Sequence, residues 1–157
     1  EVVILGDLSL GKAEETKELL NRLHGQLYLI IGNHDRFHWN PAYATDRFVW
    51  MKHYAELEDN HRRVVLSHYP MMCYHGQYYR NEKGEANTYM LYGHVHDTMD
   101  QRLIEQFQAI ARHTVRIDRN GCEVPVPCQM INCFCMYSDY EPLTLEEWIA
   151  CEQRRRK

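Results

Sequence analysis

Four short apolar runs each end at a glycine or serine that is followed at once by Asp, Asn or His. The runs and their polar endings cover residues 2–7, 27–35, 64–68 and 89–96. Continuous runs rich in Val and Ile are typical of strands buried on both faces of a sheet. In open α/β sheets, ligands bind beyond the carboxyl ends of such strands. The pattern therefore predicts one shared site that brings the four polar endings together.

The segment between the first two runs has the pattern of an amphipathic helix. Apolar positions recur at helical spacing over residues 13–23, with Glu and Lys between them, and Gly25 follows as a C-terminal cap. With the strands on either side, this helix forms a βαβ unit. We therefore expect a parallel strand pair joined by a right-handed crossover.

Further strands, loops and helices are expected along the rest of the chain. A hairpin is predicted from strands 48–57 and 63–66 around the polar turn 58–60. Residues 36–46 and 69–88 have the composition of loops, and long loops of this kind are commonly functional. An edge strand interrupted by prolines is expected within 124–136.

Two more helices complete the expected elements. Residues 102–113 show helical periodicity, and a capping-box sequence from Thr144 to Glu147 opens a helix over 145–153. The basic residues that follow, 154–157, could indicate nucleic-acid binding or simply complement the dipole of the helix; we favour the second interpretation.

Composition limits the class of protein. The chain has 157 residues, enough for one domain with a real core, and we expect a single domain over residues 1–157. A net charge of −4 argues against binding nucleic acid through a broad basic face. No stretch has the roughly 18–20 apolar residues that span a bilayer. We expect reduced cysteines and a cytoplasmic location.

The polar strand endings supply side chains that bind metals. They are Asp7, Asn33, His68, His94 and His96. Mixed oxygen and imidazole ligands favour Mn, Fe, Zn or Co over calcium. The last two histidines are two residues apart, so in an extended segment both rings leave the same face, and each could reach one of two ions about 3.5–4 Å apart.

The same residues carry a resemblance to a known family. The chain resembles the calcineurin-like metallophosphoesterases in four motifs and their order: Gly6-Asp7, Gly32-Asn33-His34-Asp35, Ser67-His68 and Gly93-His94-Val95-His96. The match covers the chain to about residue 100. The resemblance implies an α/β fold, a four-layer αββα sandwich with two mixed β-sheets. It also implies a dinuclear site, with manganese favoured, at which a metal-bound hydroxide hydrolyses a phosphate ester.

The resemblance also implies a role for each metal ligand. Asp7 would bridge the two ions. Asn33, His68 and His94 would complete the coordination of one ion, and His96 would bind the other.

Two further residues receive catalytic roles by the same resemblance. His34 would not bind metal but would act as the general acid that protonates the leaving oxygen. Asp35 would orient and polarise the His34 ring.

One departure from the family pattern affects this interpretation. Members of the family have an Asp-x-His motif on an earlier strand, and no such motif precedes Asp7 in this sequence. We expect that the sequence lacks an N-terminal strand and helix. The alternative is a one-metal or degenerate site. Function then has two candidate classes: a phosphoesterase, or a non-catalytic metal-binding or protein-interaction scaffold on the same fold.

Several residues near the motifs keep two interpretations. Arg36 could contact a substrate phosphate or form a surface ion pair, and His38 and His75 could contact substrate. Tyrosines within 69–92 could stack a nucleobase or simply pack the pocket. A structural zinc site is disfavoured because the four cysteines lack a Cys-x-x-Cys pair: Cys122, Cys128, Cys133 and Cys135.

We therefore expect a hydrolase, a phosphatase or phosphodiesterase that acts on a small phosphoester or nucleotide-like substrate. The sequence does not distinguish a phosphomonoester from a phosphodiester, and it indicates no oligomeric state. We expect neither a membrane nor long duplex nucleic acid as a partner.

Overall fold

The computed structural model describes residues 1–36, 40 and 42–156. The fold combines α-helices with three separate β-sheets, so the expected α/β class is confirmed. The first sheet is parallel and has the order β1-β2-β3, where β1 is Val2–Ile4, β2 is Leu27–Ile30 and β3 is Phe48–Lys52. Helix α1 (Ala13–Arg22) connects β1 to β2, as the βαβ pattern predicts.

The second sheet is mixed and has four strands in the order β4-β5-β6-β9. β4 pairs with β5 antiparallel, whereas β5, β6 and β9 run parallel to one another. The strands are β4 (Tyr54–Asp59), β5 (Arg62–Ser67), β6 (Thr88–Tyr92) and β9 (Met130–Asn132). One of the two main sheets is therefore mixed, as expected, while the other is parallel over its three strands.

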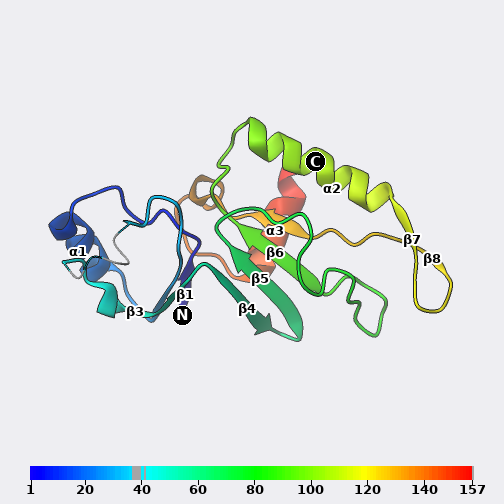
Figure 1. Cartoon of the computed structure of the whole chain (residues 1–157), viewed down its shortest axis with the longest axis horizontal. Coiled ribbons are helices and arrows are strands. Elements are labelled where there is room, and N and C mark those ends of the chain that lie inside the picture. The colour runs from blue at the N-terminus through cyan, green and yellow to red at the C-terminus, as the bar shows by residue number, and fades with distance from the viewer. Residues whose placement is uncertain (37–39, 41, 157) are drawn as a thin grey trace.

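Helices and a small hairpin complete the fold. Figure 1 shows α1 beside the first sheet, and α2 and α3 beside the second. The remaining elements are α2 (Met99–His113), β7 (Val115–Ile117), β8 (Glu123–Pro125), α3 (Leu145–Arg155) and the 3₁₀ turns Thr45–Arg47 and Cys135–Ser138. β7 and β8 pair antiparallel.

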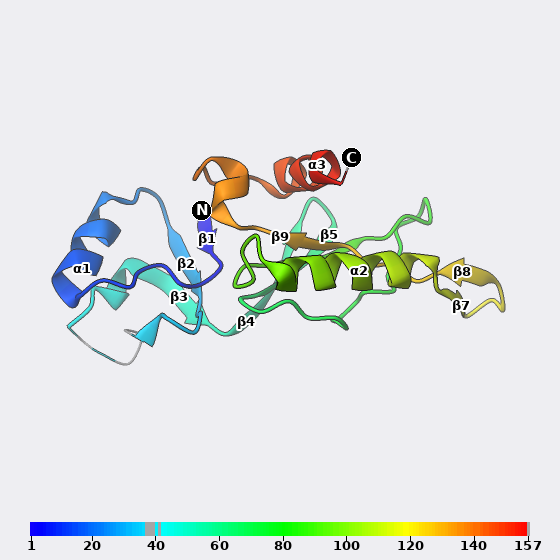
Figure 2. The same ribbon diagram turned by 90° about the horizontal axis from the view of Figure 1, so that it is seen from above.

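The period of two along the strands directs alternate residues to opposite helices. Val64 and Leu66 of β5 join a core cluster that contains Trp148 of α3, whereas Val65 joins a cluster that contains Ala111 of α2. Figure 2 shows α2 and α3 on opposite sides of this sheet. The second sheet is therefore covered on both faces, which explains its continuous apolar runs.

The first sheet has its own core and also contacts the second. Leu20 of α1 packs with Leu27 and Leu29 of β2, while Ile30, the next residue on the other face, joins the α3 cluster. The two sheets therefore share part of one core, and this contact brings their strand ends to the same region.

The predicted strand 48–57 is wrong as a single element. The chain bends at His53, so residues 48–52 form β3 in the first sheet and residues 54–59 form β4 in the second. The predicted hairpin turn is confirmed between β4 and β5. A continuous β pattern cannot show where a strand passes from one sheet to another, because both halves alternate in the same way.

The other predicted elements differ mainly at their ends. Helix α2 begins three residues earlier than expected, because the Thr98 hydroxyl accepts a hydrogen bond from the backbone N–H of Asp100. The predicted capping box of α3 is present, with Thr144 and Glu147 bonding reciprocally. The expected loop at 36–46 lies partly outside the described residues. No described helix is long and apolar enough to cross a membrane.

Candidate metal centre

The strand end after β1 is held in an unusual backbone conformation. Gly6 and Asp7 both have positive φ angles, +89° and 56°. A Cβ on Gly6 would lie 2.8 Å from Cα of Gly32 and would overlap the His68 ring, so glycine is required there. The close approach of these segments places the Asp7 carboxylate beside the ends of β2 and β5.

The Asp35 side chain holds the loops after β1 and β2 close to each other. Its carboxylate accepts hydrogen bonds from the backbone N–H groups of Asp7 (2.8 Å), Leu8 (2.9 Å) and Gly32 (2.8 Å), and the residue is fully buried. Charge-assisted bonds of this kind are about twice as strong as neutral ones. Asp35 therefore ties the loop after β1 to the loop after β2.

His68 lies at the centre of the group and is 2% exposed. Its Nδ1 lies 2.7 Å from the Leu5 carbonyl oxygen, which can only accept, so Nδ1 carries a proton. In the neutral ring, Nε2 then presents a lone pair. That atom lies 3.0 Å from Asn33 Oδ1, 3.3 Å from Asp7 Oδ2 and 3.2 Å from His94 Nδ1.

His94 follows β6, the strand next to β5 in the second sheet, and contributes a second imidazole to the group. Its φ of 55° turns the chain sharply after β6, and the ring packs on Tyr69 with centroids 4.4 Å apart. Burial, and then the neighbouring His68, lower the pKa of His94 below its usual value, although Asp7 opposes this. The ring is thus neutral at neutral pH, which is the form that binds metals.

Together these residues fit a divalent cation. Ligand atoms of Asp7, His68 and His94 all lie within 4.8 Å of one another, and Asn33 Oδ1 adjoins them. A lone pair on Nε2 that faces two oxygen acceptors is unfavourable unless a proton or a cation lies between them. The donor set, one carboxylate, one amide and two imidazoles, suits Mn, Fe, Co or Zn.

His96 is not part of this group. Its ring stacks on Phe134, with centroids 4.7 Å apart and an angle of 17° between the planes, and the residue is exposed. Within the described parts of the chain, one group with the geometry of a metal site is found, and it lacks His96. The second ion therefore remains a prediction.

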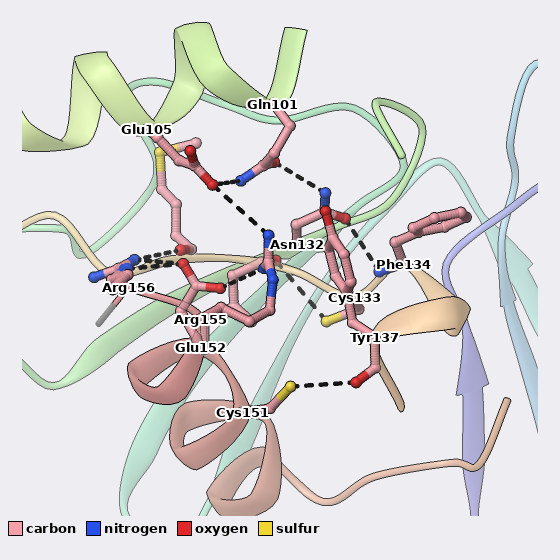
Figure 3. A network of polar contacts seen from close by, with 12 residues as sticks. Gln101, Glu105, Asn132, Cys133, Phe134, Tyr137, Cys151, Glu152, Arg155 and Arg156 are labelled. Carbon is pink, nitrogen blue, oxygen red and sulfur yellow. Dashed lines mark hydrogen bonds and ion pairs between the residues drawn. The ribbon is translucent and has the colours of Figure 1, made fainter. Parts of the chain in front are cut away.

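The backbone around His96 is held by a buried polar network. The side-chain amide of Asn132 donates to the His96 carbonyl (2.8 Å) and to Gln101 Oε1 (2.9 Å). Figure 3 shows the network continuing from Gln101 to Glu105 and through Arg155 to Glu152 of α3. Nothing in the local sequence distinguishes Asn132 from any other strand residue, so this support was not predictable.

His34 lies at the rim of the centre. Its backbone N–H donates to Asp7 Oδ1 at 2.8 Å, and the residue is exposed. This bond joins the His34 backbone to Asp7, and His34 does not belong to the group of potential metal ligands. The hydrogen bonds described for Asp35 go to backbone N–H groups, so an orienting action of Asp35 on the His34 ring stays a prediction.

The centre opens onto a cleft of about 580 Å³. His68, His94 and His96 lie along it, and its apolar walls come from β1, β5, β6 and the start of α3. The cleft gives Asp7, His68 and His94 access to solvent.

The other candidates fall elsewhere. His75 contacts Glu56 and Arg63 rather than the metal ligands, and His38 lies outside the described residues. All six cysteines are free. None belongs to the metal-type group found among the described residues. Arg155 and Arg156 of the basic tail pair with the buried Glu152, a contact that the sequence did not predict.

No protein-family model matches the chain, and no curated protein matches it. A solved structure does. The crystal structure of the protein of unknown function AQ665 from Aquifex aeolicus is similar, with a TM-score of 0.57 and 20% sequence identity. The similarity covers 92% of this chain and 72% of that one. At this level of identity it shows a shared fold.

Proposed function

We propose that this chain is a metal-dependent phosphoesterase whose metal ligands are Asp7, Asn33, His68 and His94. The observation that supports the proposal most is the environment of His68 Nε2. Its lone pair faces oxygen atoms of Asp7 and Asn33, and the opposite ring nitrogen is already committed to the Leu5 carbonyl. A cation bound at that point would satisfy all of these groups at once.

The charge of the ligand set suits a phosphate substrate. Only Asp7 contributes a negative charge, since Asn33 and the neutral histidines contribute none. A divalent ion would therefore keep a net positive charge at the centre. When bound, it would polarise a phosphoryl oxygen as a Lewis acid.

His34 is the proposed general acid. Its backbone N–H donates to Asp7 Oδ1 and the residue is exposed, and in this proposal its imidazole protonates a leaving-group oxygen without binding metal. Histidine is the side chain that most often serves as a general acid in enzymes. Asp35 supports both roles because it holds the loops that carry Asp7 and His34.

The finer predictions remain part of the proposal. They comprise the four-layer αββα arrangement, a second ion bound by His96, Mn²⁺ as the preferred metal, and a small phosphoester or nucleotide-like substrate. The structural support so far covers one ion.

Hydrolysis of two chromogenic substrates tests the proposal. The Mn²⁺-loaded protein should release p-nitrophenol from p-nitrophenyl phosphate or from bis(p-nitrophenyl) phosphate, and a chelator should abolish the release. The matched control is His24→Ala, an exposed histidine remote from the ligands in sequence, which should keep full activity.

Failure has a defined meaning. Tight Mn²⁺ binding with no turnover of either substrate would contradict the proposed phosphoesterase activity and favour a non-catalytic metal-binding scaffold. Full activity in His68→Ala would contradict the ligand assignment.

A further inference from the structure

A second, smaller pocket includes His34 in its lining. Its volume is about 300 Å³. It is lined by Ser9, Leu10, Gly11, His34, Arg36 and Tyr43. These residues come from the loop before α1 and the loop after β2, the same two loops that Asp35 ties together.

Two exposed side chains of this pocket have no partner among the described residues of the chain. The exposed guanidinium of Arg36 and the imidazole of His34 make no hydrogen bond or ion pair with the described residues. The sequence left Arg36 with two interpretations, an anion contact or a surface ion pair. Within the described structure the ion pair is absent, which favours the anion contact.

The hydroxyl groups of Ser9 and Tyr43 form hydrogen bonds within the protein. The Ser9 hydroxyl accepts from the Gly11 backbone N–H (3.0 Å) and bonds to the Thr16 hydroxyl (2.9 Å). The Tyr43 hydroxyl donates to the Gly11 carbonyl at 3.4 Å. These contacts build the pocket wall and leave Arg36 and His34 as the donors that face a ligand.

The electrostatics of the pocket favour an anion. None of the described lining residues is acidic, although the whole chain carries a net charge of −4. A guanidinium binds phosphate in a bidentate manner, and such bonds are among the strongest that side chains form.

We propose that this pocket binds a second, non-reacting phosphate of the substrate, with Arg36 as its principal contact. That this phosphate belongs to a substrate rests on the proposed phosphoesterase function. His34 lines the pocket and adjoins the metal ligands through its backbone bond to Asp7, so a leaving group protonated by His34 would extend into the pocket. The preferred substrate class is therefore a phosphoester or phosphoanhydride whose leaving group itself carries a phosphate.

Binding of inorganic phosphate to the chelator-treated protein tests the pocket without any metal. The probe is titrated at constant ionic strength, and the Arg36 Nε–H signal is followed by ¹⁵N NMR. We expect a saturable shift in the wild type and at least a tenfold weaker affinity, read from backbone signals of residues 9–11, in Arg36→Gln. Arg119→Gln removes the same charge from an exposed arginine in the β7–β8 turn, and it should bind as the wild type does.

Equal affinity in Arg36→Gln and the wild type, or no saturable shift in the wild type, would overturn this inference. Both results are independent of the metal centre. Loss of Mn²⁺ binding or of turnover, with phosphate binding intact, would instead count against the proposed function alone.

Discussion

One imidazole, that of His68, is central to the proposed metal centre. His68 is buried, and its two nitrogens have opposite surroundings: a carbonyl on one side and a cluster of potential ligands on the other. The carbonyl fixes the tautomer of the neutral ring, which leaves Nε2 as the nitrogen that would bind the proposed metal. A strand-end histidine could be expected at the site from sequence, but the Leu5 carbonyl that orients it could not.

Mutation of His34 should affect turnover without affecting metal binding, unlike mutation of a metal ligand. His34→Ala should lower the turnover of a chromogenic phosphoester by about 10²–10⁴-fold, because it removes a general acid. Metal content, measured by elemental analysis, should not change. A loss of metal in this variant would show that His34 is a ligand.

Asp35 should matter for stability although it does not contact the cation. Asp35→Asn replaces one acceptor oxygen by a donor that faces backbone N–H groups, which should destabilise the fold by about 2–3 kcal/mol. Chemical denaturation measures this change, and the exposed Asp46→Asn is the matched control. A stability equal to that of the wild type would contradict the positioning role.

At the scale of elements, a buried carboxylate holds the two arginines at the C-terminal end of α3. Glu152 is 5% exposed and pairs with Arg155 and Arg156, both at 2.8 Å. Glu152→Gln should destabilise the protein by about 2–4 kcal/mol, since it leaves the partly buried Arg156 guanidinium without its counter-charge and removes one of the two carboxylates that pair with Arg155. The exposed Glu141→Gln serves as the control in the same denaturation experiment.

The β4–β5 hairpin should give the fold a dependence on pH. The Tyr54 hydroxyl first, and then His75 and Arg63, hold the pKa of Glu56 below its usual value. The stabilisation is therefore present above the ordinary pKa of a glutamate and is lost as the pH falls through the lowered value. When the pH is lowered from 7 to 3.5, the melting temperature of the wild type should decrease by more than that of Glu56→Gln. An equal loss would contradict this linkage.

Most elements were predictable because their patterns are local. The helix at residues 13–22 follows from its periodicity, and the helix from residue 145 follows from its capping box. The bend at His53 was not predictable, because it depends on which sheet each half of the strand joins. The same limit applies to Asn132, whose role is set by contacts with α2 and the loop after β6.

At the scale of the molecule, the site exists because two sheets end in the same place. Asp7 and Asn33 follow strands of the first sheet, while His68 and His94 follow strands of the second. The shared core around Ile30 holds these ends together. The shared edge was expected from the four apolar runs, but the separate position of His96 was not, since its stacking on Phe134 depends on a segment distant in sequence.

Calorimetric titration of Mn²⁺ into the metal-free protein tests whether Asp7 and His68 bind a cation. The wild type and His24→Ala should bind the ion with the same affinity, while His68→Ala and Asp7→Asn should each bind at least 100-fold more weakly, in line with the loss expected for a ligand. Circular dichroism would verify that each variant is folded. Unchanged Mn²⁺ affinity in a folded His68→Ala variant would contradict the central claim that these strand ends form one metal centre.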